Sequence, residues 1–106
     1  MLTLISNYNY RTPPIFIVIN KYIGEAEEAL EQKRYDRVLS EVEEIIFLFS
    51  FAESHFENRD TRRTQFDEIN SKLQEIKSAA QNKKNEPVKV GIKSLKKMLS
   101  ELLRLK

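Results

Sequence analysis

The chain has 106 residues, of which 41% are hydrophobic and 32% charged, a balance that fits one globular domain and excludes a disordered chain. Its two glycines and three prolines provide too few turns for a many-stranded sheet, and the absence of cysteine excludes disulfides and thiolate metal sites. The net charge of +2 is small, but it hides an acidic first half and a basic second half.

The first predicted helix covers residues 13–33. Thr12 is a plausible N-cap, and a proline at position 13 is tolerated in a first helical turn. Apolar residues recur there at three- and four-residue steps, with either Tyr22 or Ile23 in the stripe beside Ile15, Ile19, Ala26 and Leu30. Residues 15–19 alone also fit a buried strand, but no second strand of comparable strength could pair with them. The pattern therefore favours a helix.

The second predicted helix covers residues 36–58, with Asp36 as its cap or as an acid at the positive end of its dipole. Phe47 and Phe51 point roughly opposite its apolar stripe, because each residue turns the helix by about 100°. The stripe itself consists of Val38, Val42, Ile45, Phe49, Ala52 and Phe56.

The third and fourth predicted helices cover residues 61–84 and 87–105. Asp60 or Thr61 can cap the third, and Pro87 begins the fourth, in which Gly91 indicates either fraying or close packing. The stripes are Phe66, Ile69, Leu73, Ile76 and Ala80, then Val88, Ile92, Leu95, Leu99 and Leu102. Short connections predict an all-α, four-helix, up-and-down antiparallel bundle that forms a single domain over residues 1–106. No internal repeat is evident in the sequence.

Catalytic and metal-binding patterns are absent. His55 is the only histidine, and no second imidazole or thiolate accompanies it. Glutamates at helical spacing, such as Glu27 with Glu31 or Glu41 with Glu44, lack the Glu-x-x-His partners of di-metal bundles and are typical of solvated faces. Two isolated glycines exclude a Gly-rich phosphate loop. We therefore expect no enzyme activity, no metal and no cofactor.

A local resemblance covers residues 22–53, which are similar to the helical hairpin of HEPN-type domains or of tetratricopeptide units. It rests on Ala26, Ala29, Leu30, Tyr35 and Asp36. HEPN ribonucleases carry an arginine a few residues before a histidine, whereas the nearest arginine before His55 here is Arg37. A HEPN-like domain of this sequence would therefore lack the ribonuclease motif. A tetratricopeptide array needs roughly three or more units, and the second half shows none.

The charge is divided unevenly along the chain. Residues 1–58 carry five Lys/Arg and ten Asp/Glu, and residues 59–106 carry thirteen and six. The simpler interpretation is that acidic and basic helices attract one another inside the domain. The alternative is an accessory nucleic-acid-binding protein that contacts phosphates without reading the sequence. Its candidate contacts are Lys89, Lys93, Lys96 and Lys97, with Arg104 further on.

The candidate self-association residues are Phe47, Leu48 and Phe51, because the stripe of the second helix already supplies its core contacts. Monomeric proteins rarely leave such a patch uncovered. We expect a non-catalytic interaction or scaffold module that forms a homodimer. The internal alternative is that residues 2–10 cover the patch. The longest apolar runs are far shorter than the about 20 residues of a spanning helix, and the N-terminus lacks an export leader. We therefore expect a cytoplasmic protein without a membrane span.

Overall fold

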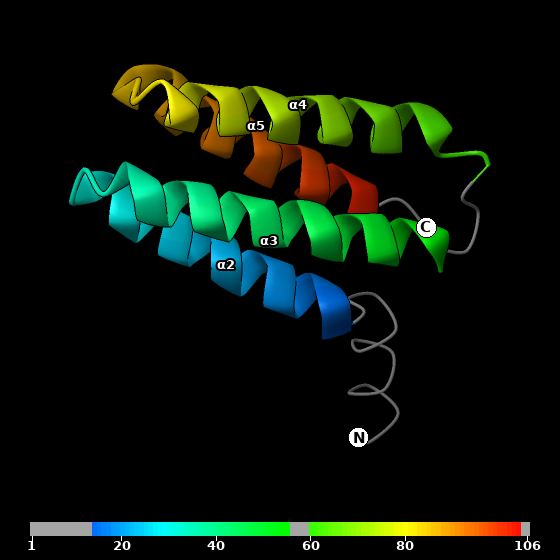
Figure 1. The fold of residues 1–106 in the computed structure, drawn as a ribbon. Helices are drawn as coiled ribbons and strands as arrows, with labels where there is room; N and C mark the ends of the chain where they lie inside the picture. Colours follow the sequence, from blue (N-terminus) through cyan, green and yellow to red (C-terminus); the bar gives the residue numbers. More distant parts are fainter. Residues whose placement is uncertain (1–13, 56–59, 105–106) are drawn as a thin grey trace.

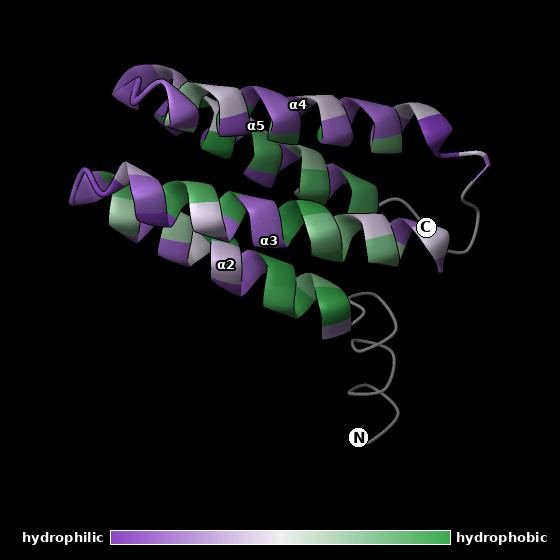
Figure 2. Cartoon of the chain, viewed as in Figure 1, coloured by the Kyte–Doolittle hydropathy of each residue, from purple (hydrophilic) through white to green (hydrophobic). Residues whose placement is uncertain are grey.

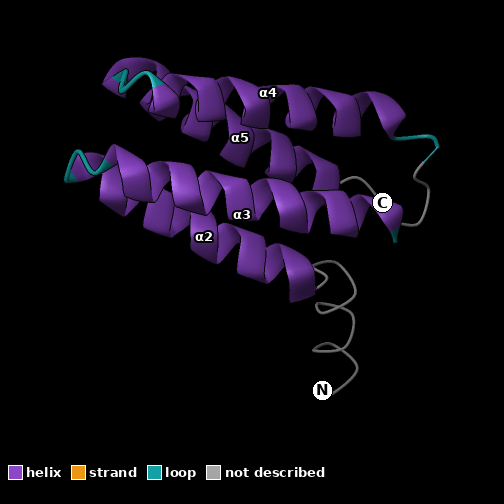
Figure 3. Cartoon of the chain, viewed as in Figure 1, coloured by secondary structure: helices purple, strands orange, loops and turns teal. Residues whose placement is uncertain are grey.

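The computed structural model describes residues 14–55 and 60–104, and all four elements in these ranges are helices (Figure 1, Figure 3). They are α2 (Pro14–Glu31), α3 (Tyr35–Ser54), α4 (Arg63–Gln81) and α5 (Asn85–Arg104). Helices α2 and α3 form a first hairpin, and α4 and α5 form a second hairpin that lies against it. Helix α2 also contacts α5, so the chain closes into the predicted up-and-down four-helix bundle.

The helix ends differ from the predicted ones by one to four residues. Helix α5 begins at Asn85, so Pro87 lies inside its first turn instead of opening it. Asp36 lies in the first turn of α3, where it faces the positive end of the dipole, and the residue at the cap is Arg34. Arg62 occupies the cap of α4, without a side-chain cap bond, in place of the predicted Asp60 or Thr61. The predicted cap at Thr12 lies outside the described residues.

One hydrophobic core runs between the four helices. All predicted stripe residues of α4 and α5 are buried, and so are those of α3 that the structure describes. In α2, Phe16 and Ile23 are buried, whereas Ile15 and Tyr22 are only partly buried. Phe49 lies at the centre of an aromatic cluster, with ring centroids 6.4 Å from Phe16 and 5.5 Å from Phe66. This cluster holds the two hairpins together near the end of α3.

The two hairpins match residue for residue at an offset of 50, a repeat that the sequence analysis missed. Helices α2 and α4 end at residues 31 and 81, and α3 and α5 span 35–54 and 85–104. Both turns place a lysine in the left-handed region, Lys33 at φ 59° and Lys83 at φ 55°. The next backbone N–H, of Arg34 or Lys84, donates to the carbonyl of Ala29 or Ala79 in each turn. The buried positions of α2 and α3 recur in α4 and α5 at the same offset, except that the equivalent of the buried Ala29, Ala79, is partly buried.

The repeat is related by an approximate two-fold axis and not by a superhelical translation. A two-fold rotation that exchanges the hairpins places α3 on α5 and α4 on α2, so it converts the α3–α4 contact into the α5–α2 contact. Both of these contacts exist, whereas the diagonal pairs, α2 with α4 and α3 with α5, barely touch. The equivalent residues Tyr35 and Asn85 meet, since the Asn85 amide donates to the Tyr35 hydroxyl over 3.1 Å. A tetratricopeptide-like stack would leave the first and last helices apart. The chain is therefore a closed bundle of two similar hairpins.

Opposite charges link the two hairpins. Lys77 lies 3.8 Å from Glu43 across the α3–α4 contact, and Lys96 lies 3.0 Å from Glu27 across the α2–α5 contact. In both ion pairs the first hairpin supplies the glutamate and the second supplies the lysine. Part of the charge asymmetry is therefore internal, although each exposed pair contributes only about 0–1 kcal/mol.

The two hairpins place the larger residue of one buried pair on different helices. Glu41 is buried in α3, and its equivalent in α5 is the buried Gly91. A Cβ atom on Gly91 would lie 2.6 Å from Cγ1 of Ile76, and the equivalent of Ile76 in the first hairpin is Ala26. The large residue thus lies on α4 in the second hairpin and on α3 in the first. This close approach requires glycine at position 91. Of the two alternatives predicted from the sequence, fraying or close packing, the structure confirms close packing.

Candidate interaction surface

Exposed large apolar side chains are concentrated on the first hairpin. In the part of the chain that the structure describes, five large hydrophobic residues are exposed, and four of them lie on this hairpin. Ile17 and Val18 in α2 are 58% and 41% exposed, and Phe47 and Phe51 in α3 are 66% and 55% exposed. The start of α2 and the end of α3 lie at the same end of the bundle, and the start of α2 is apolar on its visible side (Figure 1, Figure 2). These four residues, with the half-buried Leu48, are called the apolar face.

The second hairpin shows what the fold itself requires at these positions. The equivalents of Ile17, Val18, Phe47 and Phe51 are the exposed residues Asp67, Glu68, Lys97 and Glu101. The fold accommodates a charged residue at each position, so packing of the bundle does not account for the apolar residues of the first hairpin. Single exposed apolar residues are ordinary, but a concentration of them on one hairpin favours an interaction site there.

His55 lies at the edge of the apolar face. Its ring centroid is 4.6 Å from that of Phe51, and its Nδ1 lies 3.0 Å from the hydroxyl oxygen of Ser54 and 3.1 Å from the carbonyl oxygen of Phe51. The His55 backbone N–H donates to the carbonyl of Ala52, one of the last carbonyls of α3. His55 thus ends the helix and supports the Phe51 ring. Among the described residues, no group of three or more His, Cys, Asp and Glu could hold a metal ion.

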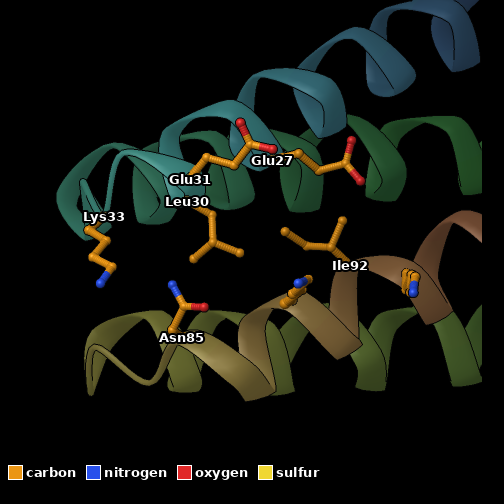
Figure 4. A pocket seen from close by; sticks show the side chains of 8 residues that line it. Glu27, Leu30, Glu31, Lys33, Asn85 and Ile92 are labelled. Carbon is orange, nitrogen blue, oxygen red and sulfur yellow. The ribbon is translucent and has the colours of Figure 1, made fainter.

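The four candidate lysines of α5 do not form one uniform row. Lys96 pairs with Glu27 of α2, and Lys89 and Lys93 line a groove of about 450 Å³ between the two helices (Figure 4). Lys97 is exposed at the position equivalent to Phe47. The same groove is lined by Glu27 and Glu31, so the basic surface of this helix lies beside carboxylates. Of the predicted site residues, the structure brings together the aromatic ones and divides the lysines between two surfaces.

Glu41 is a buried carboxylate that the sequence analysis assigned to a solvated face. Burial raises its pKa, and the nearby Glu25 of α2 raises it further, whereas Arg37, whose Nε donates to Glu41 over 3.4 Å, opposes the shift. Glu44 is exposed, as expected. The sequence signal for Glu41 is its position, one residue before Val42 and three after Val38, on the edge of the apolar stripe.

Ile17 and Val18 are site residues that the sequence reasoning missed. They lie in the run from Ile15 to Ile19, in which every residue is apolar, so periodicity cannot separate the buried side from the exposed side. The available signal was that this run contains more apolar residues than one helix face can bury, so some of them had to be exposed.

Comparison with protein-family models, with curated proteins and with solved structures gives no match. None of the four described helices has both the length and the apolar character needed to cross a bilayer. The geometry therefore has to support any functional conclusion by itself.

Proposed function

We propose that this protein is a non-catalytic helical interaction module that forms a homodimer through the apolar face of its first hairpin. The observation that carries the proposal is the difference between the hairpins: Phe47 and Phe51 stand where the second hairpin has Lys97 and Glu101. Since the same backbone positions accept charges, the aromatic residues serve a contact outside the bundle.

Burial of the apolar face supplies the driving force. Full burial of a phenylalanine side chain is worth roughly 1.5–3 kcal/mol, and Phe47 and Phe51 are both more than half exposed in the bundle. A two-fold interface uses the same patch on both copies, so each apolar residue contributes twice and no second gene product is needed. The alternative cover, residues 2–10, lies outside the described residues.

The experiment exchanges the aromatic residues for those of the second hairpin. Sedimentation equilibrium of the wild type at micromolar concentration is expected to give about twice the chain mass of 12.5 kDa. The variant Phe47→Lys/Phe51→Glu should sediment as a folded monomer with unchanged helical circular dichroism. The control is Val90→Glu, which should leave the dimer intact. Val90 is the one large hydrophobic residue exposed on the described second hairpin, at 53%.

Two results would contradict the proposal. A wild-type chain that remains monomeric excludes self-association and points to residues 2–10 as the cover. A dimer that persists in the Phe47→Lys/Phe51→Glu variant places the interface elsewhere. Nucleic-acid binding by α5 stays the alternative function, although Lys96 already pairs with Glu27 and the α5 lysines are divided between two surfaces.

A further inference from the structure

The groove between α2 and α5 is a second candidate site, near the hairpin turns and distant from the apolar face. The buried side chains of Leu30 and Ile92 extend into it from opposite helices, and Asn85 and Lys33 lie toward the turns (Figure 4). Its volume of about 450 Å³ falls within the range of roughly 300–1,000 Å³ that is typical of small-molecule sites. Leu30 and Ile92 form its apolar floor, and the other six lining residues are polar or charged.

The equivalent contact across the approximate two-fold axis carries different side chains from this groove. The equivalent contact lies between α3 and α4, where Tyr35 and Leu39 are partly buried against the core. In α5 the equivalent residues are Asn85 and Lys89, which line the groove. An aromatic and an aliphatic side chain that pack against the core in one contact are therefore replaced by an amide and a lysine in the other.

The charges around the groove favour an anion. Glu27 is engaged by Lys96 at 3.0 Å, which leaves Glu31 as the one lining carboxylate without an ion pair in the described part of the chain. Three lining lysines, Lys33, Lys89 and Lys93, also have no ion pair among the described residues. The rim thus has an excess of positive charge. The Asn85 amide gives one N–H to the Tyr35 hydroxyl and has a second N–H to donate.

We propose that this groove binds a small amphiphilic carboxylate. Its aliphatic chain lies on Leu30 and Ile92, and its carboxylate lies among Lys89, Lys93 and the Asn85 amide. Burial of the chain supplies most of the affinity, and the lysines orient the ligand and select the sign of its charge. The proposal does not depend on self-association, because the apolar face lies at the other end of the first hairpin.

The test titrates dodecanoate, below its micelle concentration, into ¹⁵N-labelled protein that carries Phe47→Lys/Phe51→Glu, so that the apolar face cannot bind the probe. Saturable one-to-one binding is expected, with the largest amide shifts at Leu30, Asn85 and Ile92. Acetate, which has the carboxylate without the chain, should not bind. Dodecyltrimethylammonium, which has the chain with a positive charge, should bind at least tenfold more weakly.

Two variants of the groove and one control complete the test. Asn85→Tyr/Lys89→Leu introduces the residues of the α3–α4 contact and should weaken dodecanoate binding more than tenfold. Lys93→Glu, which keeps the apolar floor, should do the same. Lys97→Ala changes a lysine of the same helix outside the groove and should have no effect. The proposal is overturned if dodecanoate shows no saturable binding, if both groove variants bind it as tightly as the parent, or if the cationic probe binds equally well.

Discussion

Replacing each glycine by alanine separates helix propensity from packing, because the two glycines differ only in their surroundings. Both lie inside helices, where alanine is favoured by about 1 kcal/mol. A Cβ atom on Gly24 meets nothing within 4 Å, so Gly24→Ala should raise the free energy of unfolding by about that amount. A Cβ atom on Gly91 would lie 2.6 Å from Cγ1 of Ile76, a buried β-branched side chain that cannot easily rotate away.

The propensity gain is common to both variants, so the difference between them measures the overpacking at Ile76. Overpacking of a core typically costs about 1–3 kcal/mol, which makes Gly91→Ala less stable than Gly24→Ala by that amount. For a domain of this size the unfolding midpoints should differ by roughly 4–8 °C for each kcal/mol. Thermal and urea unfolding at one fixed protein concentration provide the assay.

A double-mutant cycle identifies the residue responsible. Ile76→Ala copies Ala26 of the first hairpin, and it should cost less in the Gly91→Ala background than in the wild type, with a coupling of about 0.5–3 kcal/mol. If Gly91→Ala proves as stabilising as Gly24→Ala, the close approach of Ile76 to α5 is refuted.

Two further predictions concern charged residues. Burial and Glu25 raise the pKa of Glu41, so the folded state holds this proton more tightly than the unfolded state, and wild-type stability falls as the pH rises through the raised pKa. Glu41→Gln should therefore be more stable than the wild type at pH 7, by up to about 1 kcal/mol. Urea titrations should show this advantage shrinking as the pH falls through the raised pKa and disappearing below about 4.5, where the carboxyl is protonated in both states. If α5 binds duplex DNA or RNA, Lys93→Glu/Lys96→Glu should abolish a mobility shift that already weakens steeply with salt. A wild type that shows no shift at low ionic strength eliminates the nucleic-acid alternative.

Helical periodicity was sufficient to predict the four helices and most of the core. It worked in α4 and α5 because polar residues separate the apolar ones there, so only one helix face can be the buried one. Phe66 and Leu95 are examples of residues correctly assigned to the core. It failed at the start of α2, where an all-apolar run gave no contrast and Ile15 was assigned to the core in place of Phe16. Helix ends were less certain, because the caps of α3 and α4 are arginines without a side-chain cap bond.

The candidate site was only partly predictable. Phe47 and Phe51 could be placed outside the core from the helix repeat alone, and the structure confirms that both are exposed. The repeat of the hairpin was not visible, because few of the equivalent residues are identical and many charged residues of one hairpin have an uncharged equivalent in the other. The lysines of α5 could be placed opposite the leucine stripe, but which of them face α2 depends on how the helices pack, and local sequence does not encode this.

Spin labels at equivalent positions of the two hairpins test most directly whether the first hairpin forms the dimer interface. The chain has no cysteine, and the equivalent residues Ser50 and Ser100 are both exposed serines, so Ser50→Cys and Ser100→Cys each introduce one label in a matched setting. Ser50 lies between Phe47 and Phe51 in sequence, whereas Ser100 lies on the second hairpin. Double electron–electron resonance should give a short, narrow distance between the two Ser50 labels of a dimer. The Ser100 labels should lie about 20 Å further apart, one helix layer of roughly 10 Å on each side. A shorter distance for Ser100 than for Ser50, or no dipolar signal from either label, would contradict the interface.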